Sequence, residues 1–134
     1  MKIWYGYGSE HSMNLVMIGH FKDVGSAAQA KQILDQLTEQ VRMDAEAGLI
    51  EIGQHTERFS DPALDLLQKI SVHILSPDEM EQFGYDFNLK VDDANVVLTT
   101  DESDVSAFLK VMIDKGARVE VYSAHEHPGT GYGR

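Results

Sequence analysis

The sequence predicts an α+β protein, a ferredoxin-like α/β sandwich with two main helices on one face of an antiparallel sheet, plus short extra helices. Two observations predict this class. A strand–helix–strand pattern runs over residues 13–52, and the same pattern recurs over residues 96–122. A doubly wound sheet is the alternative, but too few helices alternate with strands to favour it.

The first unit opens on a continuous apolar run from Leu15 to Ile18, which is typical of a strand covered on both faces. Asp23 is the predicted N-cap of the following helix. From Ala27 onward apolar residues recur at steps of three and four, which predicts a helix of roughly 22 residues. Gly48 is its predicted C′ residue, because glycine readily adopts a positive φ. Residues 49–52 have strand character and are the predicted return strand.

Two shorter helices are predicted between the units. Asp61 can cap the first, with Pro62 at its first helical position. Ser76 and Glu79 have the spacing of a capping box before the second. Residues 71–75 could either close the first helix or form a short strand.

The second unit follows a predicted hairpin of strands 87–91 and 96–99, joined by a polar turn. A helix is predicted over residues 101–115, with Asp101 as its cap. Its apolar face consists of Val105, Phe108, Leu109, Met112 and Ile113. The alternating stretch 117–122 is the last predicted strand, and Tyr122 should face away from the core.

The whole chain, residues 1–134, is expected to be a single domain. Residues 2–5 are a candidate edge strand, and residues 124–134 are expected to form an irregular tail. No apolar run approaches the roughly 20 residues that a membrane span needs. The N-terminus also lacks the apolar region of a signal peptide, so a cytoplasmic protein without a membrane partner is expected.

The charge balance is strongly acidic, with 22 Asp and Glu against 11 Lys and Arg and a formal net charge of −11. This balance disfavours nucleic-acid binding, which requires basic patches. It is compatible with a basic protein partner or with high solubility alone. The chain has no cysteine, which excludes disulfides, a thiol nucleophile and cysteine-based metal sites.

One candidate site follows from the predicted topology. The first and last strands of such a sheet are neighbours, so residues before the first strand should lie beside residues after the last. This brings together a potential ligand-binding set: Tyr7, Glu10, His11, His125, Glu126 and His127. Histidine and glutamate can bind a metal or transfer protons, and the metal candidates are His11, His125 and His127. No recognised zinc spacing is present, and exposed loops without a joint role are the competing interpretation.

Other polar residues have simpler interpretations. His20 lies within the central strand and is expected to be a partly buried imidazole with satisfied hydrogen bonds, and the same is expected of His73. The acidic groups around Asp101 and Asp104 are expected to serve turns and caps, with an acidic surface for a basic partner as the alternative. The aromatic residues near the two termini fit edge packing or an interface.

The opening segment 6–12, the following strand, and the closing segment 128–134 resemble those of a group of short bacterial proteins of unknown function. The resemblance covers most of the chain. It implies a free-standing small protein and carries no activity, cofactor or site residue that could be transferred.

Two functions are therefore expected. The first is a non-enzymatic protein-binding or regulatory module of the immunity or antitoxin type, which needs no cofactor and exploits charge complementarity with its target. The alternative is a small enzyme or metal-binding protein that uses the His/Glu cluster and a divalent metal. A homodimer formed through an uncovered sheet face is a further expectation.

Overall fold

The computed structural model describes residues 15–102 and 104–123. Its elements follow in the order β1 (Leu15–His20), α1 (Val24–Glu46), α2 (Asp61–Lys69), η2 (Pro77–Gly84), β2 (Asn88–Asp92), β3 (Asn95–Thr100), α3 (Ser106–Asp114) and β4 (Arg118–Ser123). The short element η2 is a 3-10 helix. The predicted α+β class is confirmed. The predictions for residues 2–5 and 124–134 lie outside the described residues.

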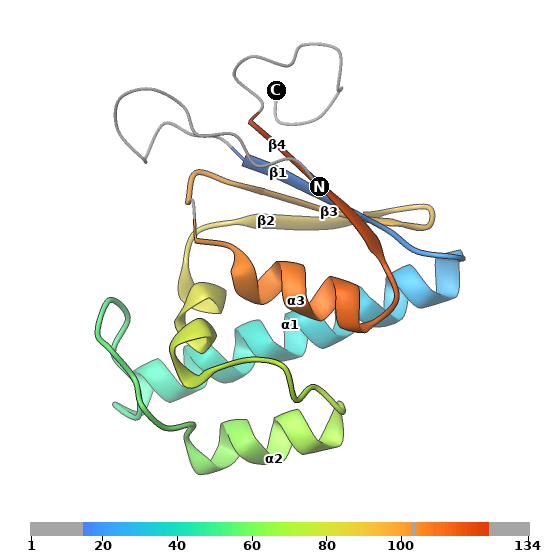
Figure 1. The fold of residues 1–134 in the computed structure, drawn as a ribbon. Coiled ribbons are helices and arrows are strands. Elements are labelled where there is room, and N and C mark those ends of the chain that lie inside the picture. Colours follow the sequence, from blue (N-terminus) through green and yellow to red (C-terminus); the bar gives the residue numbers. More distant parts are fainter. Residues whose placement is uncertain (1–14, 103, 124–134) are drawn as a thin grey trace.

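The four strands form one antiparallel sheet in the order β2-β3-β1-β4. Figure 1 shows the helices on one side of this sheet, with α1 and α3 next to it and α2 farther away. The first and last strands are neighbours, as predicted, and Leu15 lies opposite Ser123. The closer ferredoxin-like assignment stays a prediction. None of the described helices combines the length and the apolar character that a membrane span requires.

The first strand and the long helix form as predicted. The Asp23 carboxylate accepts a hydrogen bond from the Ser26 amide at 2.7 Å, which caps α1. Gly48 follows the helix with a φ of 76°. The apolar stripe of α1 faces the sheet and is buried: Ala27, Ala30, Ile33, Leu34, Leu37 and Val41.

The predicted return strand at residues 49–52 is wrong. This segment has no strand, and Leu49 and Ile52 are 53% and 39% exposed. The backbone amide of Gly53 donates to the Glu81 carboxylate at 2.6 Å instead of to a neighbouring strand. The chain first passes through α2 and η2 and returns to the sheet only at β2. Residues 71–75, which were ambiguous, form neither helix nor strand.

Two predicted helix caps are also wrong. Ser60, not Asp61, caps α2, because the Ser60 hydroxyl accepts from the Ala63 amide at 3.1 Å. Helix α3 begins at Ser106 instead of Asp101. Its Ala107 amide donates to the side chain of Gln82 in η2 at 2.7 Å, so a distant element satisfies this helix terminus. The capping box at Ser76 is confirmed.

The core lies between the sheet and the helices, where Phe83 and Phe108 are among the largest fully buried side chains. The buried face of α3 is shifted from the predicted one, since Ile113 is 52% exposed. The buried residues of α3 are Ala107, Phe108, Val111 and Met112. A second apolar cluster, consisting of Val16, Ile18 and Val97, lies on the other face of the sheet.

Candidate functional site

The site predicted near the termini stays a prediction. Its six residues lie outside the described part of the chain: Tyr7, Glu10, His11, His125, Glu126 and His127. The strands next to these residues in the sequence, β1 and β4, do lie side by side, with Leu15 opposite Ser123. Among the residues that the structure describes, no group of three or more His, Asp or Glu side chains could hold a metal ion.

His20 is partly buried and hydrogen-bonded at both ring nitrogens, as predicted. Its Nδ1 lies 2.9 Å from Asn95 Oδ1 and its Nε2 lies 2.6 Å from Glu120 Oε1. The Tyr122 hydroxyl donates to the same carboxylate, and Tyr122 packs on the second apolar cluster, away from the main core as expected. These hydrogen bonds, first from Tyr122 and then from His20, hold the pKa of Glu120 below its ordinary value. The prediction for His73 is wrong, because its side chain is exposed.

A partly apolar cavity of about 520 Å³ lies between the second half of α1 and the end of η2. Buried Val41 and Phe83 form part of its wall, and Ile52 contributes an exposed side chain. A Cβ on Gly84 would stand 2.7 Å from the Ile52 side chain, so glycine permits this close approach. Tyr85 lines the same cavity, and its hydroxyl donates to Glu81 Oε1 at 3.1 Å.

An acidic rim surrounds Tyr85 at this cavity: Asp86 lines the cavity, Glu81 accepts from the Tyr85 hydroxyl, and the charges of Glu102 and Asp104 act on the phenol. We define it by the carboxylates of Glu81, Asp86, Glu102 and Asp104, which come from η2, from the segment before β2 and from the segment before α3. Among the described residues, none of the four forms an ion pair with a lysine or arginine. The nearby cations are already paired, since Lys110 contacts Glu79 at 2.8 Å and Arg42 contacts Glu46 at 2.7 Å.

The negative charge of the rim changes the titration of its neighbours. Desolvation, the hydrogen bond to Glu81 and the charges of Glu81, Asp104 and Glu102 together raise the pKa of Tyr85 to about 12. Desolvation and the charges of Glu81 and Glu79 raise the pKa of Asp104 above its ordinary value. The carboxylates of Glu81 and Asp104 therefore lie close enough to repel one another, and a cation brought to the rim would relieve this repulsion.

The Tyr85 titration gives a direct check on this geometry. In the Glu81→Gln variant the pKa of Tyr85 should fall from about 12 toward the ordinary value of about 10. The reason is that the charged acceptor, which is also the largest single charge acting on the phenol, is replaced by a neutral amide, while the desolvation of the phenol remains. The ring signal of Tyr85 can be followed by NMR across the alkaline range. The control Glu57→Gln, at an exposed position, should leave the pKa of Tyr85 unchanged. A pKa of Tyr85 near 10 in the wild-type protein would contradict the close contact between Tyr85 and Glu81.

Sequence reasoning missed this site as a unit. The acidic residues around Asp101 and Asp104 are predicted to serve turns and caps, with an acidic surface for a basic partner as the alternative, but that prediction includes neither the cavity nor Tyr85. The signal in the sequence is a local one, because Glu81, Tyr85 and Asp86 lie within six positions. The approach of Ile52 and Glu102 depends on the tertiary fold, which brings two other segments against η2.

The chain matches the model of a family described as a family of unknown function, DUF6375, over residues 1–134. No curated protein and no solved structure matches it. The expected resemblance to a family of unknown function is confirmed, and the match carries no activity.

Proposed function

The chain belongs to the DUF6375 family, and for this member we propose a non-enzymatic role in which it binds a segment of a partner protein. The segment carries lysine or arginine residues beside a large apolar side chain. It docks with its apolar side chain in the cavity next to Tyr85 and its cationic groups on the acidic rim. The observation that carries this proposal is the adjacency of a partly apolar cavity to carboxylates that have no ion-pair partner among the described residues.

The physical argument has two parts. Tyr85 and Ile52 offer apolar surface, and aromatic side chains in cavities are frequent anchors of protein interfaces. The rim supplies charge complementarity, which speeds association and selects against acidic partners. The chain's formal charge of −11 extends this attraction beyond the rim. A regulatory role of the immunity or antitoxin type is the concrete form of the proposal.

Binding of a designed peptide tests the charge part. A labelled peptide with arginines flanking a leucine–phenylalanine pair should bind the wild-type protein. The double variant Glu102→Gln with Asp104→Asn should bind it about tenfold more weakly at low ionic strength, because each lost charge removes roughly 1 kcal/mol or less at a solvated site. The difference should shrink as salt is added. Fluorescence anisotropy measures the dissociation constant in each case.

The matched control removes the same charge elsewhere. Asp65→Asn with Asp93→Asn changes two exposed carboxylates, and asparagine tolerates the positive φ of 52° at position 93. This control should bind the peptide within about twofold of wild type. If both double variants bound the peptide equally weakly, the net charge of the protein alone would explain the binding, and the acidic rim would not be the peptide's binding site.

The other expectations stay predictions. The alternative enzymatic or metal-binding function requires the terminal His/Glu residues, which lie outside the described part of the chain. The homodimer and the cytoplasmic location have no further support.

A further inference from the structure

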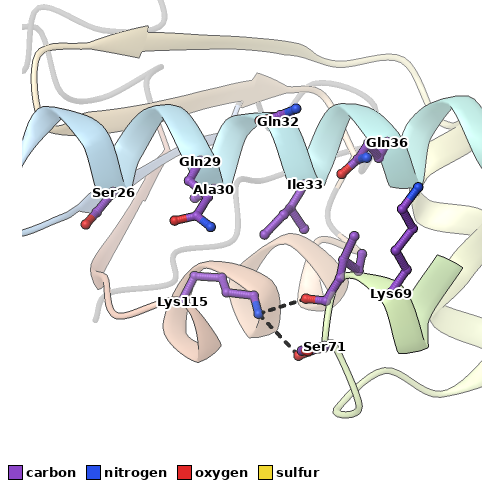
Figure 2. A pocket seen from close by; sticks show the side chains of 10 residues that line it. Ser26, Gln29, Ala30, Gln32, Ile33, Gln36, Lys69, Ser71 and Lys115 are labelled. Carbon is purple, nitrogen blue, oxygen red and sulfur yellow. Dashed lines mark hydrogen bonds between the residues drawn. The ribbon is translucent and has the colours of Figure 1, made fainter.

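A second cavity, of about 490 Å³, lies beside the first half of α1, where it faces the end of α2 and the end of α3. Figure 2 shows the α1 helix along one side of this groove, with Lys115, Ser71 and Lys69 on the other. The Tyr85 cavity borders the second half of the same helix, so the two cavities share no lining residue.

The α1 wall is rich in uncommitted polar groups. Gln29 and Gln36 lie seven positions apart and so occupy the same helix face, separated by the apolar side chain of Ile33. Among the described residues, neither carboxamide has a hydrogen-bond partner. Each carboxamide can donate and accept. The hydroxyl of Ser26, which also hydrogen-bonds to the Asp23 carboxylate, extends this wall. Such groups are suited to a ligand with several hydroxyls.

The opposite wall of the groove carries two lysines, Lys115 and Lys69, in a protein with a formal net charge of −11. Lys115 Nζ donates to the carbonyl oxygens of Ile70 at 3.1 Å and of Ser71 at 3.2 Å, which fixes the ammonium at the groove. Its contact with Asp114 is longer, at 3.5 Å. Lys69 also lines the groove, and within the described part of the chain it forms no ion pair.

The groove therefore combines a fixed cation, a second cation and a polar wall. Ser71 has a left-handed backbone with a φ of 57° because it ends α2: the Val72 amide donates to the Leu67 carbonyl at 3.0 Å, and the Ser71 amide donates to the Gln68 carbonyl at 3.3 Å. A volume of about 490 Å³ falls in the range of small-molecule sites. Because the rest of the surface is predominantly acidic, an anion would be attracted here and repelled from most other places.

We propose that this groove binds a small molecule with an anionic head and a hydroxyl-rich body, the shared chemistry of sugar phosphates and sugar acids. Lys115 and Lys69 contact the anionic head, and Gln29, Gln36 and Ser26 hydrogen-bond the hydroxyls. This site is independent of the proposed peptide surface.

The test uses three probes on the ¹⁵N-labelled chain of residues 1–134: glucose 6-phosphate, gluconate and neutral glucose. At least one of the two anionic probes should shift the side-chain amide signals of Gln29 and Gln36. Binding by the phosphate alone, by the carboxylate alone or by both identifies the head group. Glucose should cause much smaller shifts, because it lacks the charge that the lysines recognise.

Two variants locate the charge. Lys69→Gln should weaken binding of the active probe about fivefold to tenfold, the effect of one charge-assisted contact at a partly solvated site. Lys22→Gln removes the same charge outside the groove and should leave the dissociation constant unchanged. The proposal is wrong if neither anion shifts the glutamine signals, if glucose shifts them equally, or if both variants weaken binding alike.

Discussion

Replacing Phe108 with alanine is expected to lower the free energy of unfolding by about 3–5 kcal/mol. The side chain is 2% exposed, and its ring centroid lies 4.9 Å from that of Phe83 and 4.8 Å from that of Phe87 in edge-to-face contacts. Truncation would leave a cavity where α3, η2 and the start of β2 meet. Edge-to-face pairs add about 0.5–1.5 kcal/mol each beyond the area that they bury.

Chemical denaturation measures this loss, and Ile113→Ala on the same helix is the matched control. Ile113 is 52% exposed, so its truncation should cost about 1 kcal/mol or less. The effect should reach the proposed peptide site as well, because Phe83 and Phe87 also line the Tyr85 cavity. Similar losses in the two variants would show that Phe108 is not the centre of this cluster.

Replacing Glu79 with alanine is expected to cost about 2–3 kcal/mol of unfolding free energy. This carboxylate is 11% exposed and contacts Lys110 Nζ at 2.8 Å. It also accepts from the Ser106 hydroxyl at 2.7 Å and from the Ser76 amide at 2.9 Å, so it joins η2 to α3. Its loss removes three hydrogen bonds and leaves the Lys110 ammonium without its partner.

The same residue makes stability depend on pH. Desolvation raises the pKa of Glu79, but the hydrogen bonds from Lys110, Ser76 and Ser106 outweigh it, and the pKa lies below its ordinary value. A depressed folded-state pKa stabilises the protein above the unfolded-state value of about 4.3, and this contribution is lost as the pH falls through the folded-state pKa. Unfolding of Glu79→Gln should therefore be less sensitive to acid than that of the wild type.

The control for Glu79 is Glu46→Ala. Glu46 also forms an ion pair, at 2.7 Å from Arg42, but both side chains are more than half exposed. Its loss should cost less than about 1 kcal/mol, which is usual for surface ion pairs. If Glu79→Ala and Glu46→Ala lowered the free energy of unfolding equally, the Glu79 contacts between η2 and α3 would stabilise the protein no more than a surface ion pair does.

The sequence was sufficient for elements whose signals are local. The long helix α1 is marked by its apolar spacing and by the Asp23 cap. The predicted pairing of the first and last strands is also confirmed, although the first strand–helix–strand unit from which it was argued lacks its return strand. Prediction from the sequence failed where a residue distant in the sequence determines where an element begins. Asp101 has the composition of a cap, but Gln82, which lies 25 positions before Ala107, satisfies the start of α3.

The missed return strand has a similar cause. Residues 49–52 have the apolar composition of a strand, yet Ile52 packs against Gly84, a contact that depends on where η2 lies. For the same reason the sequence could predict an acidic surface around Asp101 and Asp104 only as an alternative, and could not place Tyr85 or the cavity beside it. Glu81 and Glu102 are separated by 21 positions, and only the packing of η2 against the start of α3 brings both charges to Tyr85.

The central claim is that a basic, partly apolar peptide binds beside Tyr85, and mapping its binding by NMR is the most direct test. On titration of the arginine-rich peptide into ¹⁵N-labelled protein, the largest shifts should occur at Ile52, Tyr85 and Glu102, and Tyr85→Ala should abolish most of the binding. Absence of binding, or shifts confined to the sheet face that carries His20 and Tyr122, would contradict the account.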